Sequence, residues 1–175
     1  MEKENRHSIQ GQMCRKIMSP FFGTLGVIDC SYLEERKETV MMRIINLGPW
    51  VFYIEGKPQF DEHKVGKWMY FFKDKERVAG LCKAAVEQGI VLEAKHSDAP
   101  DGVSCFYLEC DDMESHKKVI QFFLDNDMIQ KTKTGKLYNI SFKLDDQTRA
   151  GEYGEMFQSE IKLEQFLDLY TGEWK

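Results

Sequence analysis

Short apolar runs and amphipathic segments follow one another along this chain in a regular order. Runs of apolar and β-branched residues, several alternating with polar ones, predict strands at 39–47, 50–56, 67–72, 90–97, 103–110 and 138–144. Apolar residues spaced three or four apart predict helices at 75–88 and 112–126, and a further helix within 159–174. The first of these helices has Asp74 as a predicted N-cap and Gly89 just after its end.

The predicted elements run strand–helix–strand–strand–helix–strand, with extra strands before them and a helix after them. Helices that connect antiparallel strands in this order must cover one face of a single sheet, which predicts an α+β protein. We expect a curved antiparallel sheet of about six to eight strands, with two or three helices packed on one face. Residues 1–12 are polar and are predicted to be flexible. Residues 13–175 are predicted to form one domain.

Three lysines are predicted to share the sheet face that the helices leave open. Side chains of a strand point alternately to its two faces. Lys95 and Lys143 therefore lie opposite the apolar residues of their strands, and Lys67 joins them if Trp68 faces the helices. Amines that gather on one surface repel each other unless an anion lies between them, which suggests a phosphate site.

The stretch "NISFKLDDQTRAGEYG", residues 139–154, strengthens this hypothesis because it follows a predicted strand with many polar side chains. Hydroxyl and guanidinium groups are good donors to phosphate oxygens. In the alternative interpretation, the lysines are solvated and pair with Glu93, Asp145 or Asp146. The candidate ligand-binding residues are Lys67, Lys95, Lys143, Thr148, Arg149 and Tyr153.

Composition narrows the class of protein. The formal net charge of −5 argues against a general nucleic-acid coat, although a local basic groove stays open. Five cysteines without a CxxC pair are typical of reduced thiols in a cytoplasmic protein. The chain has no apolar run of about 18 residues and no signal-peptide pattern, so we expect a soluble protein without a membrane partner.

Several of these segments resemble a family of uncharacterised proteins related to basophilic leukaemia-expressed protein. The similarity spans about residues 66–154. It rests on a Gly-Lys-Trp strand, an Ala-Lys-x-Ser strand, an aromatic–Asp strand and a Lys-x-Asp-x-x-Thr-x-x-Gly-x-Tyr segment. Residues 1–50 have no counterpart in this pattern, and His96 within the Ala-Lys motif departs from it. The residues that carry the resemblance are Lys67, Trp68, Lys95, Ser97, Lys143, Asp145, Thr148, Gly151 and Tyr153.

The resemblance implies a fold like that of translation initiation factor 4E, with a ferredoxin-like fold as the alternative. Some members of the family carry the label of a phosphothreonine lyase domain. A lyase needs a base and an acid, but Lys95 and His96 are strand neighbours and point to opposite faces. Cap-type recognition stacks a base between two indoles, for which Trp50, Trp68 and Trp174 supply rings.

The sequence therefore leaves three functions open. The first is a binding protein for a phosphorylated small molecule, nucleotide or phosphopeptide. The second is a phosphate-processing enzyme of the phosphothreonine-lyase type, and the third is an adaptor with a protein partner. Walker, GxGxxG, HExxH and GxSxG motifs are absent, and we predict no cofactor and no metal.

Overall fold

The computed structural model describes residues 41–175, which lie within one compact unit, Glu38–Lys175. The predicted flexible N-terminus at 1–12 and the first part of the predicted domain, 13–40, lie outside the described residues.

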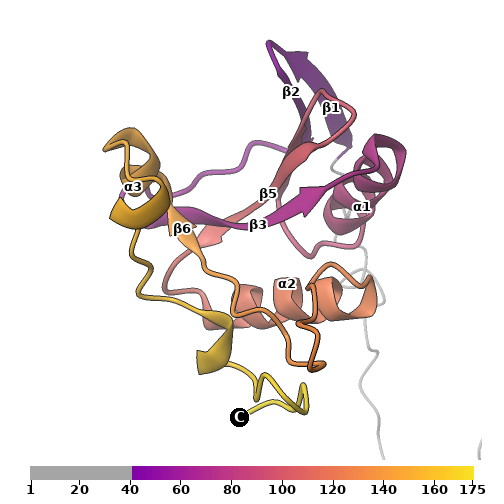
Figure 1. The fold of residues 1–175 in the computed structure, drawn as a ribbon. Coiled ribbons are helices and arrows are strands. Elements are labelled where there is room, and N and C mark those ends of the chain that lie inside the picture. Colours follow the sequence, from indigo (N-terminus) through magenta and orange to yellow (C-terminus); the bar gives the residue numbers. More distant parts are fainter. Residues whose placement is uncertain (1–40) are drawn as a thin grey trace, which may run out of the picture. The chain divides into compact units, whose positions relative to one another are not determined.

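A single antiparallel sheet organises the described chain (Figure 1). Its six strands lie in the order β1-β2-β4-β5-β3-β6, and every neighbouring pair is antiparallel. This arrangement confirms the predicted α+β class with a curved antiparallel sheet. The strands are β1 Met42–Leu47, β2 Trp50–Glu55, β3 Val65–Phe72, β4 Glu93–Ser97, β5 Gly102–Glu109 and β6 Lys143–Leu144.

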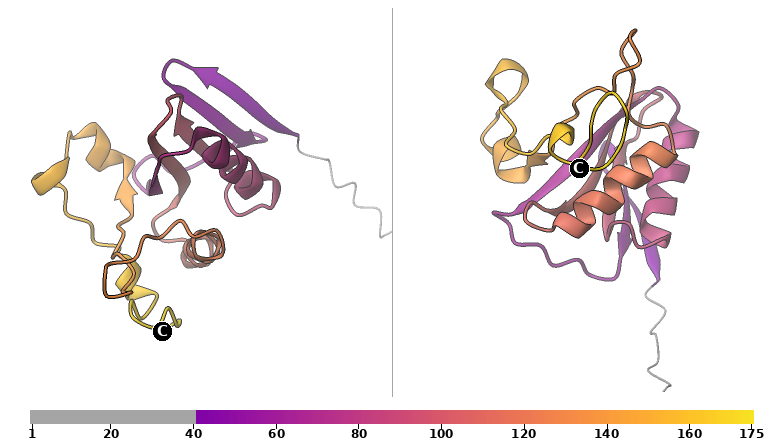
Figure 2. Two further views of the ribbon diagram at one scale, coloured as in Figure 1. Left: turned by 45° about the vertical axis from the view of Figure 1, so that its right-hand side comes forward. Right: turned by 90° about the horizontal axis from the view of Figure 1, so that it is seen from below.

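Two long helices, α1 (Lys75–Glu87) and α2 (Met113–Asp125), pack on the same face of the sheet (Figure 2). The Asp74 carboxylate accepts a hydrogen bond from the Arg77 backbone N–H at 2.9 Å, so the predicted N-cap is confirmed. Asp112 caps α2 in the same way, at 3.0 Å from the Ser115 N–H. A short helix, α3 (Asp145–Arg149), follows β6 directly (Figure 1).

The connectivity explains how two distant strands become neighbours. From β3 to β6 the elements run β-α-β-β-α-β, the order of a ferredoxin-like unit, and the hairpin β1–β2 extends the sheet beside β4. As a result, β3 lies between β5 and β6. This position brings Lys67 directly opposite Lys143.

The core lies between the sheet and the helices. Trp68 and Phe106 point from the sheet into this layer and are fully buried against residues such as Phe123 of α2. The buried Trp68 indole donates to His116 Nδ1 at 3.0 Å, and His116 Nε2 donates to the Cys110 carbonyl at 3.1 Å. Both polar rings are thus paired, as burial requires.

The predicted strand at 138–144 is mostly wrong. Only Lys143 and Leu144 form a strand. Of the preceding residues, Ile140 and Phe142 hydrogen-bond with the C-terminal segment, and the Tyr138 N–H donates to the Gln130 carbonyl. The Phe142 N–H donates to the Ile161 carbonyl, and the Leu163 N–H donates to the Ile140 carbonyl. The expected alternation of faces holds at Phe142, which is buried, and at Lys143 on the opposite side.

The predicted C-terminal helix is also wrong. Its place is taken by a single 3₁₀ turn, Leu163–Gln165, because the backbone groups around it pair with the segment before β6. Leu163, Phe166 and Leu167 are buried as expected, but Tyr170 is 71% exposed. A smaller difference occurs in β4, which begins at Glu93 rather than at residue 90.

Candidate functional site

The open face of the sheet carries side chains in three cross-strand rows. The strand register defines them, because residues opposite one another on neighbouring strands point to the same face. The first row is Trp50 with Ser97 and Phe71 with Val103, and the Val103 N–H donates to Ser97 Oγ at 3.2 Å. The second row is Phe52, Lys95, Cys105 and Met69. The third row is Ile54, Glu93, Tyr107, Lys67 and Lys143.

A cavity of about 460 Å³ lies on this face and spans all three rows. The α3 helix and the loop after it form one wall, with Thr148, Tyr153, Gly154 and Phe157. The sheet forms the floor with Trp50, Lys67, Met69, Phe71, Lys95, Val103, Cys105, Tyr107 and Lys143. Five of the six candidate residues named above, Lys67, Lys95, Lys143, Thr148 and Tyr153, therefore line one cavity.

Arg149 does not line the cavity. Its guanidinium pairs with Asp146 and donates to the Glu62 carbonyl at 2.7 Å, which ties α3 to the loop before β3. The nearby Asp146 carboxylate also accepts from His63 Nδ1 at 3.1 Å, assuming that nitrogen carries the proton. These contacts of Arg149 could not be predicted from the sequence, because they depend on α3, which was not predicted.

Lys67 is held by groups of the protein itself. Its amine forms an ion pair with Asp145 and donates to Thr148 Oγ1 at 2.7 Å. The Lys67 side chain is only 7% exposed, and that of Asp145 is 27% exposed. The Asp145 alternative considered from the sequence thus applies to Lys67, whose ion pair attaches α3 to β3.

Lys143 has a different environment. Its amine donates to the Glu152 carbonyl and lies 3.8 Å from the Tyr153 ring centroid and 5.0 Å from that of Phe157. It has no carboxylate within ion-pair distance among residues 41–175. Burial lowers the pKa of the Lys143 amine, and the positive charge of Lys67 adds to this effect.

Lys95 lies among aromatic rings. Its amine is 4.5 Å from the Trp50 ring centroid, 5.2 Å from that of Phe52 and 5.3 Å from that of Tyr107. These are cation–π distances. In the described part of the chain, Lys95 also forms no ion pair with a carboxylate.

The remaining titratable groups at the cavity floor are uncharged at neutral pH. Burial raises the pKa of the Cys105 thiol, against the opposing effect of Lys95 and Lys67. Burial also raises the pKa of the Tyr107 hydroxyl. An anion on the floor therefore meets no thiolate or phenolate, and the nearest carboxylates are Asp145, which pairs with Lys67, and Glu93, which lies opposite Tyr107.

His96 and Trp68 lie on the opposite side of the sheet from the cavity. His96 is buried in the helical layer, where its Nδ1 donates to the Ser97 carbonyl at 2.9 Å and its Nε2 accepts from the Tyr53 hydroxyl at 3.3 Å. Trp68 is a core residue. The Trp174 indole donates to Gln121 at 3.3 Å and is not a lining residue. Trp50 is thus the one tryptophan among the lining residues, and a stack between two indoles is not built into this cavity.

Sequence reasoning missed the aromatic part of the site. Trp50, Tyr107 and Phe157 surround the two unpaired lysines, yet only Trp50 was considered, as a ring for cap-type recognition, and none of the three was among the candidate ligand-binding residues. Alternation along a strand shows which of its residues share a face. Only the pairing of β2 and β5 with β4 shows that Trp50 and Tyr107 lie on the same face of the sheet as Lys95. Phe157 lies in a loop, for which the sequence offers no such signal.

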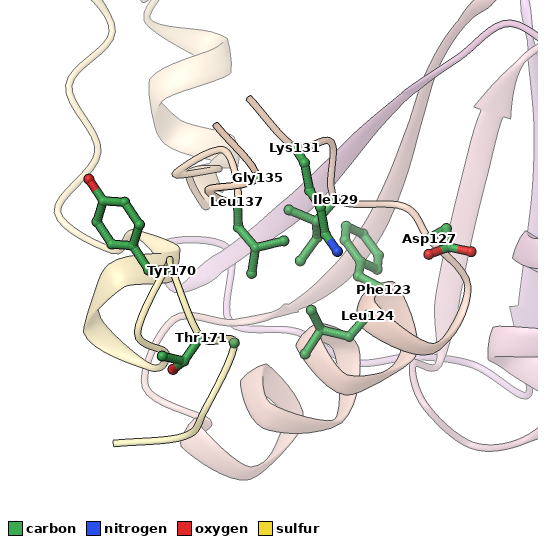
Figure 3. Close-up of a pocket in the computed structure, with 10 residues that line it drawn as sticks. Phe123, Leu124, Asp127, Ile129, Lys131, Gly135, Leu137, Tyr170 and Thr171 are labelled. Carbon is green, nitrogen blue, oxygen red and sulfur yellow. The ribbon is translucent and has the colours of Figure 1, made fainter. Parts of the chain in front are cut away.

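A second, smaller cavity of about 220 Å³ lies between the end of α2 and the C-terminal segment. Figure 3 shows Phe123 and Leu124 from α2 facing Leu137, with Tyr170 and Thr171 from the C-terminal segment on the other side. Its lining contains one lysine, Lys131, and one carboxylate, Asp127. The smaller cavity gathers no cluster of charged or nucleophilic groups. The open-face cavity is therefore the stronger candidate site.

Within residues 41–175, no group of three or more His, Cys, Asp or Glu side chains is placed to hold a metal ion. None of the helices in this range is long and apolar enough to cross a membrane.

Fold and cavity together define an α+β protein that presents lysines and aromatic rings in a hollow on the open face of its sheet. No protein-family model and no curated protein matches the chain. The resemblance to the family of basophilic leukaemia-expressed protein, and with it the initiation factor 4E-like fold, therefore stays a prediction.

Proposed function

We propose that the protein binds a phosphorylated or otherwise anionic ligand in the open-face cavity, between Lys95 and Lys143. The observation that carries this proposal is that both amines line one cavity and neither has a carboxylate partner among the described residues. Two such cations in a partly buried hollow favour an anion, because each amine then gains the counter-charge that it lacks.

The arrangement around Tyr107 supports one location for the anion. The Tyr107 ring centroid lies 5.3 Å from the Lys95 amine and 5.9 Å from the Lys67 amine, so the ring lies between these two cations. Lys143 is opposite Lys67 on the neighbouring strand. An anion above Tyr107 would therefore have the Lys67–Lys143 pair on one side and Lys95 diagonally across on β4, next to Glu93, whose carboxyl lies opposite Tyr107 and has a pKa raised by burial.

A thermal-shift screen of phosphorylated metabolites, nucleotides and phosphopeptides tests the proposal. A ligand at 100 times its Kd adds about 2.7 kcal/mol to the free energy of unfolding, which a melting curve detects. Lys95→Ala and Lys143→Ala should each abolish most of the shift. Lys136→Ala is a matched control, because the Lys136 amine also lies over a tyrosine ring, 5.0 Å from the Tyr170 centroid, but does not line the cavity.

Two results would contradict the proposal: no anion in the screen shifts the melting temperature, or the shift survives in both cavity variants. Either result would favour the third function considered from the sequence, an adaptor that uses the open face as a protein interface.

A phosphate-processing enzyme is a second candidate, favoured by the lowered pKa of Lys143. A buried lysine whose pKa falls can act as a general base, the role that removal of an α-proton requires. No histidine is among the lining residues, so a general acid would have to come from another group. Lys143→Arg separates the two functions in a phosphate-release assay with phosphopeptides. This variant should keep anion binding, because it keeps the positive charge, and should lose any turnover that depends on a neutral amine.

A further inference from the structure

The open-face cavity has two chemically different ends. The third row holds Lys67, Lys143 and Tyr107, whereas the first row holds Trp50, Val103 and Phe71. Lys67 and Phe71 are four residues apart on β3. At roughly 3.3 Å per residue, the two rows are therefore about 13 Å apart along the strands. The second row, with Lys95 and Met69, lies midway between them.

The first-row end is apolar and open. Phe71 is 67% exposed although it lines the cavity. Neither Val103 nor Phe71 has a polar side-chain atom, and the Trp50 indole N–H is the one donor that the lining side chains of the first row supply. The Lys95 amine of the second row lies 4.5 Å from the Trp50 ring centroid, so the apolar surface is that of Val103, Phe71 and the neighbouring Met69. An apolar group bound here would cover Phe71 and lose no hydrogen bonds.

A nucleobase fits this end poorly. Its ring edges carry several donors and acceptors, and each group that packs against Val103 or Phe71 and is withdrawn from water costs about 1–3 kcal/mol. A hydrocarbon group, whether aryl or alkyl, has no such groups to satisfy.

We propose that the natural ligand is a phosphate monoester of an uncharged apolar group, with its phosphate above Tyr107 and its apolar group against Val103, Met69 and Phe71. This inference rests on the proposed function, because it assumes that the anion binds at the lysines. It adds the chemical class of the rest of the ligand.

Isothermal titration calorimetry with four matched probes tests the inference: inorganic phosphate, phenyl phosphate, hexyl phosphate and adenosine monophosphate. Phenyl or hexyl phosphate should bind at least about tenfold more tightly than inorganic phosphate, because each buries an apolar group. The tighter of these two should also bind more tightly than adenosine monophosphate. Comparison of phenyl with hexyl phosphate decides between an aryl and an alkyl ligand.

Variants locate the effect. Phe71→Ser should lower the affinity for phenyl and hexyl phosphate much more than that for inorganic phosphate, and so remove most of the tenfold gain, whereas Lys143→Ala should weaken all the probes that bind. Tyr138→Ser is a matched control, because Tyr138 is an exposed aromatic residue that does not line the cavity. It should change none of the affinities.

The outcomes separate the two proposals. If inorganic phosphate and adenosine monophosphate bind in a Lys143-dependent way but the apolar esters bind no more tightly, this inference is wrong and the proposed function stands. If adenosine monophosphate binds most tightly, the inference is also wrong. If no probe binds, the proposed function fails and the inference fails with it.

Discussion

The three lysines of the open face occupy different environments. Lys67 pairs with Asp145 and Thr148, while Lys95 and Lys143 contact aromatic rings and lack a carboxylate partner among the described residues. The same residue type at neighbouring positions thus has two roles. Lys67 holds α3 on the sheet, and the other two are available to a ligand.

This difference predicts that alanine substitution lowers the free energy of unfolding by different amounts at the two kinds of site. Lys67→Ala should lower the free energy of unfolding by about 3 kcal/mol, the lower end for a broken buried ion pair, because Asp145 keeps a quarter of its side chain in water. Lys95→Ala should lower the free energy of unfolding by less than about 1 kcal/mol, since it removes only cation–π contacts of a partly exposed amine. Urea unfolding of the two variants measures both values. Equal losses would mean that Lys95 also has a structural role.

His116 predicts a pH dependence of stability. The ring is fully buried, and burial lowers its pKa below the usual 6.5. Its Nδ1 accepts from Trp68, so a proton on that nitrogen would break the bond. The unfolded chain binds this proton more readily than the folded one. The contribution of neutral His116 is therefore fully present above about pH 6.5 and is lost as the pH falls below it.

Urea unfolding at pH 7.5 and at pH 5.5 measures this effect in the wild type and in His116→Gln, which cannot titrate. The wild type should lose more stability than the variant over this interval. The exposed His63, whose pKa is raised by its hydrogen bond to Asp146, acts with the opposite sign. It is present in both proteins and cancels in the comparison. An equal loss in the two proteins would contradict the role of His116.

At the scale of elements, the contact between β3 and β6 fixes the position of Lys143. Gly66 lies opposite Leu144, and a Cβ at Gly66 would be 2.5 Å from the Phe142 ring and 2.7 Å from the Lys143 carbonyl. β6 approaches β3 this closely because Gly66 has no side chain.

Gly66→Ala should therefore displace β6, lower the free energy of unfolding by about 1–3 kcal/mol and weaken anion binding. Gly80→Ala is the matched control. Gly80 lies within α1, and nothing lies within 4 Å of an added Cβ. It should raise stability by up to about 1 kcal/mol and leave binding unchanged. Chemical denaturation of both variants measures their stability, and calorimetry measures anion binding. Unchanged binding in Gly66→Ala would contradict the prediction, because it would show that a displacement of β6 leaves the site intact.

Elements with local signals could be predicted from the sequence, and elements with distant hydrogen-bond partners could not. α1 and α2 carry their own caps and apolar spacing. Residues 138–142 look like a strand, but Tyr138 pairs with Gln130 whereas Ile140 and Phe142 pair with Leu163 and Ile161, so they form isolated contacts instead. α3 was not predicted, although the acids Asp145 and Asp146 in its first turn and Arg149 in its last suit a helix.

At the scale of the whole molecule, the cavity assembles residues from five strands, α3 and a loop, between positions 50 and 157. Alternation along single strands sufficed to predict the face of Lys95 and Lys143, whereas that of Lys67 depended on the face that Trp68 takes. The aromatic surroundings depend on which strands are neighbours, and β5 and β3 are brought together by the β-α-β-β-α-β connectivity. The cationic half of the candidate site was therefore predictable, and most of its aromatic half was not.

The β4 strand has a consequence for how this protein tolerates change. Ala94 and His96 face the helices, and Lys95 between them faces the cavity. A slip of β4 by a single position would drive an ammonium group into the apolar interior and expose the residues that now fill it. Insertions or deletions in the turns that flank β4 should therefore abolish folding and ligand recognition together. Neither property should change without the other.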